Sequence, residues 1–423
     1  MSVIADHGTI FLWMACIFGF FMAWGVGAND VANAMGTSVG SRALTVRQAI
    51  VIAILLESAG AFLAGGSVTS TIRNDIIDLR MPELLANPEL LIYGMLASLL
   101  ASATWLLIAT HYGWPVSTTH SIIGAIVGFA VAGVDASVVH WHNVLSIAGS
   151  WILSPLFSGM LALLVFSSVQ KLILDTESPF RSAKRYIPVY TFLVGFMISM
   201  VTLTKGMGHL GLNLNTPQAL ALATLIGLLL TAIAVIALQR IKKDEQADQQ
   251  FHYSSVERIF ATMMIFTACT MAFAHGSNDV ANAVGPLAAV AQVVRSGGNI
   301  AANTSLPSWV LLLGASGIVC GLATYGYRVM ATIGQHLTEL TPSRGFAAEV
   351  SAATTVVLAS GIGLPVSTTH ILVGAVLGVG LARGIGALNL QVIGTVFLSW
   401  LVTLPAGALL SIAYFSLFRS IFS

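Results

Sequence analysis

The chain has 423 residues, of which 56% are hydrophobic and only 8% are charged, and its formal net charge is +1. Soluble domains carry about 25% charged residues, so this composition excludes a soluble globular protein and predicts one that crosses the membrane many times. The near-zero net charge also argues against a partner nucleic acid, which requires clustered basic residues. Cys16, Cys269 and Cys320 lie in apolar stretches and give neither a disulfide framework nor a metal pattern.

Apolar runs long enough to cross a bilayer, which takes about 20 helical residues, recur along the whole chain. In order, they span residues 9–26, 47–66, 91–110, 143–168, 187–204, 218–238, 259–275, 307–330, 346–361 and 390–418. Two further stretches, 113–128 and 363–378, are apolar only after a polar head, which suits a short crossing, a helix broken near the middle of the membrane or a re-entrant hairpin. The sequence therefore predicts an all-α polytopic membrane protein with about 12 transmembrane segments.

The most polar stretch, Gln239–Arg258, is interpreted as a linker between two transmembrane parts. It divides the chain into an N-terminal repeat with additional helices (1–238), the linker loop (239–258) and a C-terminal inverted repeat (259–423). Another polar connection, Lys171–Arg185, lies two crossings earlier, and the basic residues of both connections place them in the cytoplasm. If each broken stretch makes one net crossing, seven crossings precede the linker, so the N-terminus is expected outside.

Two sequence signatures occur twice, once in each half of the chain. GANDVANAMGTSVG at 27–40 matches GSNDVANAVGPLAA at 276–289, and GWPVSTTHSIIGAIVG at 113–128 matches GLPVSTTHILVGAVLG at 363–378. The NDVAN copies are 249 residues apart and the PVSTTH copies 250, which indicates an internal duplication. An odd number of intervening crossings makes the two repeats inverted, which is the architecture of many secondary transporters.

The NDVAN signature places a carboxylate and two carboxamides in a membrane span. A carboxylate at membrane depth is costly and marks a functional site, and amide oxygens beside it suit a hard cation. The flanking glycines are expected to weaken the helix and expose its backbone to the site, and close helix packing is the alternative. The predicted cation-binding residues, for sodium or a proton, are Asn29, Asp30, Asn33, Asn278, Asp279 and Asn282, with Asp30 and Asp279 as the metal ligands for sodium.

In the PVSTTH signature, three residues with side-chain hydroxyl groups follow a proline that favours a helix start. A helix that starts inside the membrane directs unpaired N–H groups and the positive end of its dipole at whatever lies there. This predicts an anion site for phosphate or sulfate, although ordinary helix capping explains the same residues. The predicted phosphate-binding residues are Ser117, Thr118, Thr119, Ser367, Thr368 and Thr369. His120 and His370 end the signatures and are as readily structural as proton-sensing.

Glu57 and Glu349 are the remaining acids within apolar runs, and alignment of the PVSTTH copies puts Glu349 opposite Leu99. They are predicted to bind cations, carry a proton or stabilise a polar interior. An enzyme is disfavoured because Ser117 and His120 at a helix start do not form a nucleophile elbow, and the chain has neither a GxSxG context nor HExxH. A passive anion channel, the alternative from a different class, requires a continuous polar pore.

The duplicated GANDVAN and PVSTTH signatures resemble those of the inorganic phosphate transporter (Pit) family, and the resemblance covers nearly the whole chain. It implies a secondary active transporter that imports phosphate with sodium or protons by alternating access and without a cofactor. A sulfate permease and a metal-phosphate and proton symporter are the alternatives on the same scaffold. The resemblance assigns the cation-coordinating aspartates to Asp30 and Asp279, the hydroxyls to residues 117–119 and 367–369, and two membrane glutamates to Glu57 and Glu349.

Three further expectations follow from this interpretation. The short linker indicates a microbial protein, so the chain is expected in the lipid bilayer of a bacterial inner membrane. A homodimer is expected by resemblance to the family. Asp30 and Asp279 are expected to lie close together around a central cavity, because inverted repeats place a transport site at their interface.

Overall fold

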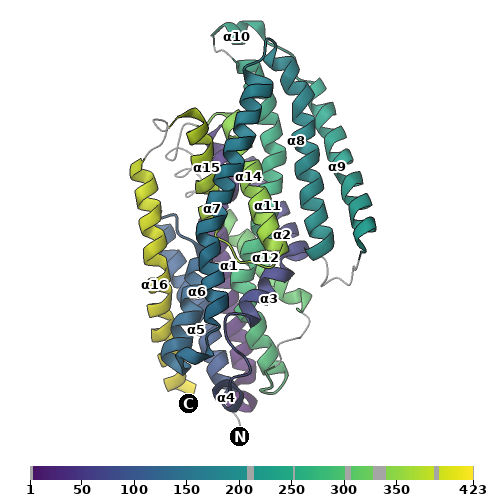
Figure 1. The fold of residues 1–423 in the computed structure, drawn as a ribbon. Coiled ribbons are helices and arrows are strands. Elements are labelled where there is room, and N and C mark those ends of the chain that lie inside the picture. The colour runs from purple at the N-terminus through teal and green to yellow at the C-terminus, as the bar shows by residue number, and fades with distance from the viewer. Residues whose placement is uncertain are drawn as a thin grey trace.

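The computed structural model describes residues 3–206, 214–250, 253–300, 306–326, 340–384 and 390–422, and these are largely helical (Figure 1). Nine helices within these ranges are long and apolar enough to cross a membrane, and two shorter apolar helices accompany them. This confirms the predicted all-α polytopic membrane fold. The composition explains it, because a backbone in lipid must satisfy its hydrogen bonds within each helix.

The first half contains nine helices in the described residues. They are α1 (Val3–Gly40), α2 (Val46–Ala64), α3 (Gly66–Asn74), α4 (Pro82–Ala86), α5 (Pro88–His111), α6 (Thr118–Phe129), α7 (Trp141–Val169), α8 (Pro179–Val201) and α9 (Thr216–Gln239). Short π-helical turns extend three of them, at Ala130–Val134, Gln170–Leu174 and Thr202–Gly206, and a 3₁₀ turn covers Ala136–Val138.

The linker and second half contribute the remaining described helices. They are α10 (Glu245–Gln250), α11 (Ser254–Arg295), α12 (Ser308–Gly321) with its π-helical turn Leu322–Gly326, α14 (Pro342–Gly361), α15 (Thr368–Arg383) and α16 (Leu390–Phe422). The stretch predicted as a linker loop thus includes one short helix, and Lys184 of α8 donates a hydrogen bond to the carbonyl oxygen of Ile241 in it (2.6 Å). The division at residues 238 and 258 remains our proposal.

The helices that carry the NDVAN copies, α1 and α11, cross the molecule in opposite directions (Figure 1). Gly8 near the start of α1 packs against Val294 near the end of α11. Ser41, which follows α1, donates to the sulfur of Met264 near the start of α11 (3.2 Å). The N-terminus and α10 lie at opposite ends of the molecule, so the repeats are inverted as predicted.

The NDVAN segments do not interrupt their helices, so the expectation of a weakened helix is wrong. α1 is helical along its whole length, and α11 continues through Pro286. The glycines serve close packing instead: a Cβ on Gly27 would lie 2.0 Å from the carbonyl oxygen of Ile318, and one on Gly276 would lie 2.1 Å from that of Glu57. Because Gly27 and Gly276 are equivalent, Ile318 of α12 is the structural counterpart of Glu57 of α2.

The PVSTTH stretches form the returning arms of hairpins, which is one of the arrangements predicted for them, so the count of crossings that assumed one net crossing each does not apply. α5 ends at His111, the chain turns, and α6 returns beside α5, so that Gly94 near the start of α5 packs against Phe129 at the end of α6. α14 and α15 form the equivalent pair. The first hairpin replaces two predicted crossings with none, so the number of crossings before the linker stays odd and the inversion is preserved.

Candidate functional site

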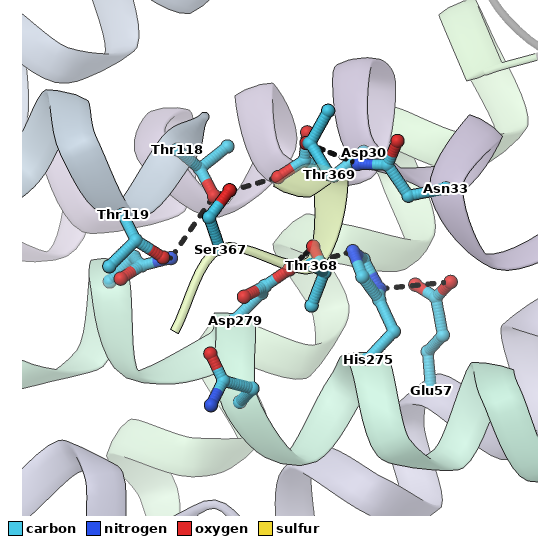
Figure 2. Close-up of polar contacts among 12 residues, drawn as sticks. Asp30, Asn33, Glu57, Thr118, Thr119, His275, Asp279, Ser367, Thr368 and Thr369 are labelled. Carbon is cyan, nitrogen blue, oxygen red and sulfur yellow. Dashed lines mark hydrogen bonds and ion pairs between the residues drawn. The ribbon is translucent and has the colours of Figure 1, made fainter. Parts of the chain in front are cut away.

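The two NDVAN segments and the tips of the two hairpins meet at the centre of the helix bundle (Figure 2). α6 begins at Thr118, and the Ser117 hydroxyl caps it by accepting a hydrogen bond from the N–H of His120 (3.2 Å). Ser367 caps α15 in the same way (3.3 Å). The predicted helix starts are confirmed, and their first N–H groups lie inside the bundle because the preceding residues turn there.

Each aspartate accepts a hydrogen bond from the first threonine of the hairpin helix in its own repeat (Figure 2). Thr118 Oγ1 donates to Asp30 Oδ2 (2.7 Å), and Thr368 Oγ1 donates to Asp279 Oδ2 (2.8 Å). All four residues are at most 2% exposed. The residues predicted for cation binding and for anion binding are therefore in direct contact, in a conformation that closes the centre to solvent.

The second asparagine of each signature reaches across to the other repeat. Asn33 Nδ2 donates to Thr369 Oγ1 (2.7 Å), and Asn282 Nδ2 donates to Thr119 Oγ1 (3.3 Å). These contacts connect the two hairpin tips across the centre. Each threonine then donates to a main-chain carbonyl of the opposite hairpin: Thr119 to Val366 (3.0 Å) and Thr369 to Val116 (3.4 Å).

The first asparagine of each signature is anchored within its own repeat. Asn29 Nδ2 donates to Thr110 Oγ1 (3.0 Å), and the Asn278 side-chain amide bonds to Ser360 Oγ (3.1 Å). Both contacts join the NDVAN helix to the last turn of the hairpin's outer helix. These asparagines therefore position the hairpins against the aspartates.

His275 is a third ionisable group beside the two aspartates, and it was not among the residues predicted from sequence. Its Nε2 lies 2.9 Å from Asp279 Oδ2, and its Nδ1 lies 3.2 Å from Glu57 Oε1, with all three side chains fully buried (Figure 2). Ligand atoms of Asp30, His275 and Asp279 lie within 4.8 Å of one another. Asp30 and Asp279 are thus as close as the inverted-repeat interpretation requires, and these three residues can hold a cation.

A sequence signal for His275 exists. The residue lies one helical turn before Asp279, on the same face of α11, in an otherwise apolar run. A comparison of the two repeats does not identify His275, because its counterpart 249 residues earlier is Val26.

Glu349 lies apart from this centre. Its Oε1 accepts hydrogen bonds from Ser38 Oγ (2.6 Å) and from the hydroxyl of Thr37, and its Oε2 accepts one from Thr267. Thr37 follows Asp30 by seven residues, about two helical turns along α1. Glu349 therefore joins α1, α11 and α14 on the linker side of the centre, and sequence reasoning did not identify its three hydroxyl partners.

His120 and His370 pack in an aromatic cluster behind the hairpin tips. Their ring centroids are 4.4 Å apart, and each ring also packs on a tryptophan, His120 on Trp151 (3.8 Å) and His370 on Trp400 (3.4 Å). His370 Nδ1 also contacts the carbonyl oxygen of Trp151 (3.1 Å). These contacts hold α7 and α16 against the hairpin helices and favour the structural interpretation of both histidines.

Inverted repeats whose ionisable and hydroxyl residues meet at a buried centre define a membrane transporter. A family model described as the phosphate transporter family matches residues 26–411. The chain is 50% identical to a relative from Haemophilus influenzae that bears the name phosphate permease, with 100% of both chains covered. It is 41% identical to the chloroplastic inorganic phosphate transporter 2-1 of Arabidopsis thaliana, covering 96% of this chain and 72% of that protein.

The fold is also similar to that of a solved structure, the sodium-dependent phosphate transporter. The TM-score is 0.90 at 39% identity, covering 97% of this chain and 100% of that chain. The chain therefore belongs to the phosphate transporter family, as its signatures predict.

Proposed function

We propose that this protein imports inorganic phosphate together with sodium by alternating access. The observation that carries the proposal is the direct contact between Asp30 and Thr118, and between Asp279 and Thr368, at the interface of the inverted repeats. The solved structure similar to this chain is that of a sodium-dependent phosphate transporter, which supports sodium as the coupling ion.

The geometry supplies a reason for coupling. In the described conformation the threonine hydroxyls donate to Asp30 and Asp279. A cation held by these carboxylates takes over their oxygen atoms, which leaves the hydroxyls and the first N–H groups of α6 and α15 to donate to phosphate. The cation also removes the repulsion between buried carboxylates and the anion, which is large at low dielectric. Phosphate binding therefore depends on prior cation binding.

The proposed ligands are those that the signatures predict. Phosphate binds to Ser117, Thr118, Thr119, Ser367, Thr368 and Thr369. The coupling cation binds to Asn29, Asp30, Asn33, Asn278, Asp279 and Asn282, with Glu57 and Glu349 as further candidates.

The proposed orientation places the α10 end of the molecule in the cytoplasm. The basic connection Lys171–Arg185 and the linker lie together at that end, where Lys184 contacts Ile241. The positive-inside rule assigns such an end to the cytoplasm. Both termini would then lie outside a bacterial inner membrane (Figure 1), and assembly as a homodimer is part of the same proposal.

Radiolabelled phosphate uptake into proteoliposomes, with sodium and proton gradients imposed separately and sulfate as a competitor, tests this function. Asp30→Asn and Asp279→Asn are each expected to reduce sodium-driven uptake at least tenfold, because the neutral amide removes a charge that binds the cation. Asp6→Asn, at an exposed site on the same helix as Asp30, is the matched control and is expected to transport normally. Unchanged uptake by Asp30→Asn at normal protein levels would refute the assignment.

A second candidate is symport of a metal-phosphate complex with protons. The observation that favours it is the nitrogen of His275 beside the oxygens of Asp30 and Asp279, since imidazole suits transition metals whereas hard cations prefer oxygen. In the same assay, uptake that stops on chelation of divalent metals and proceeds without sodium would replace sodium coupling with this candidate.

A further inference from the structure

The two aspartates have different surroundings although their signatures are nearly identical. Asp279 Oδ2 contacts both Thr368 and His275. Asp30 Oδ2 contacts Thr118, and Asp30 Oδ1 is buried without a hydrogen-bond partner among the described residues. Asp279 is therefore held from two sides, whereas Asp30 keeps one carboxylate oxygen uncommitted.

The difference arises from residues outside the duplicated signatures. His275 on α11 has Val26 as its counterpart on α1. Glu57 on α2 has Ile318 as its counterpart on α12, because the two residues make equivalent backbone contacts with Gly276 and Gly27. Asp279 thus has a glutamate and a histidine in its surroundings, where the equivalent positions around Asp30 hold two aliphatic side chains.

Glu57, His275 and Asp279 form a linear chain of contacts. The imidazole has one nitrogen facing each carboxylate, at 3.2 Å for Glu57 and 2.9 Å for Asp279, and it has no exposed surface. Because each ring nitrogen faces a carboxylate, the orientation of the imidazole is fixed from both sides, and the contact with Glu57 holds the other nitrogen against Asp279. Glu57 therefore influences Asp279 through His275, across the packed contact of α2 and α11.

We propose that Glu57 and His275 are a positioning pair that fixes Asp279 and so makes the two aspartates unequal in cation binding. The inference rests on the proposed function. Asp279 enters the cation site with its carboxylate already oriented, and Asp30, with its uncommitted oxygen, turns to complete the site as the cation arrives. The pair sets the affinity for sodium, while the hydroxyls and helix starts bind phosphate.

The sodium dependence of phosphate uptake in proteoliposomes tests the pair with Glu57→Gln, His275→Gln and the double variant. Each single variant is expected to raise the half-saturating sodium concentration about tenfold, the usual effect of removing a group that orients a metal ligand. The KM for phosphate at saturating sodium is expected to stay unchanged. The double variant should match His275→Gln alone, because Glu57 acts through the histidine.

Two results overturn the inference. One is an unchanged half-saturating sodium concentration in His275→Gln, and the other is a double variant whose shift is the product of the two single shifts, which would make Glu57 an independent ligand. His140→Gln is the matched control: it removes a histidine that lies 3.6 Å from Asp78 at a partly exposed position, and it should leave sodium dependence unchanged.

A second measurement covers variants that do not transport. The thermal stability of the purified protein is titrated with sodium, and the stabilising concentration should rise about tenfold in His275→Gln; an unshifted titration overturns the inference. Asp30→Asn in the same uptake assay distinguishes failure of the proposed function from failure of the positioning pair. Normal sodium-driven uptake by Asp30→Asn removes the proposed function, whereas its loss beside an unaffected His275→Gln removes only the positioning pair.

Discussion

The helices α1 and α11 pack against each other in opposite directions, and their contact has one end on the linker side of the centre and one on the opposite side. The two ends have the same backbone arrangement but different side chains. On the linker side, a fully buried carboxylate accepts hydrogen bonds from three hydroxyls; the residues are Thr37, Ser38, Thr267 and Glu349. On the opposite side, alignment of the repeats places Pro286, Leu287, Phe18 and Leu99. Leu99 and Leu287 are fully buried in the main hydrophobic cluster, and Phe18 packs against it. One end of the crossing is therefore a polar junction and the other an apolar one.

This difference shows that an inverted repeat can keep its helices and signatures while its two ends diverge. In alternating access, the repeats exchange conformations so that the central site opens first to one side and then to the other. Opening on the linker side separates hydroxyl groups and a carboxylate that can contact an ion. Opening on the opposite side separates aliphatic and aromatic surfaces, so the two openings differ in cost even though the backbone motions are related by symmetry.

The largest expected effect on stability comes from a carboxylate introduced at the apolar end of the α1 and α11 contact. Leu99→Glu buries a carboxylate whose aligned neighbours, Phe18 and Leu287, have no donors, and an uncompensated buried charge costs about 3–5 kcal/mol. We expect a strong loss of thermal stability and of purified yield. Leu99→Met, which conserves volume, should cost less than about 1.5 kcal/mol. Wild-type stability in Leu99→Glu would mean that this end already accommodates charge, and the contrast between the ends would fail.

A smaller effect on stability is expected when the carboxylate at the polar end is replaced by an apolar side chain. Glu349→Leu removes the acceptor of three hydroxyls, whereas Glu349→Gln keeps one acceptor oxygen. Buried donors left without a partner cost about 1–3 kcal/mol each, although Thr267 also has the carbonyl oxygen of Met264 within 3.3 Å. We expect the leucine variant to be less stable than the glutamine variant by about 2 kcal/mol, measured by thermal unfolding in detergent. Equal stabilities would show that the hydroxyls find other acceptors.

Composition and the duplication predicted much of the fold, because long apolar runs and a repeat offset can be read without tertiary contacts. They left open whether the PVSTTH stretches cross the membrane or form re-entrant hairpins. The run at 91–110 is as long as a true crossing, and only the packing of Gly94 on Phe129 shows that α6 returns beside α5. The glycines beside NDVAN were equally ambiguous, since glycine suits both a broken helix and a close contact between helices. The backbone of Ile318 lies against Gly27, which shows that the glycine serves a close helix contact.

The candidate site likewise contains residues that the sequence predicted and one that it did not. Asp30, Asp279, Thr118 and Thr368 were identified because each has a partner in the other repeat, and the structure brings all four together. His275 was missed because a search for repeated polar residues rejects a histidine whose counterpart is aliphatic. A residue that makes a duplicated site asymmetric is present in one repeat only, so a comparison of the two repeats does not find it.

The smallest expected effect concerns a single hydrogen bond at the polar end. Ser38→Ala removes one donor to Glu349 Oε1 (2.6 Å), while Thr37 still donates to the same oxygen. Since one acceptor retains a partner and no donor is left unpaired, the loss should be about 1 kcal/mol, which a thermal unfolding experiment detects. In the Glu349→Leu background the same substitution should instead recover stability, because it removes a buried hydroxyl that has lost its acceptor. An equal cost in both backgrounds would show that Ser38 stabilises the crossing by packing, and that the contrast between the two ends does not depend on the carboxylate.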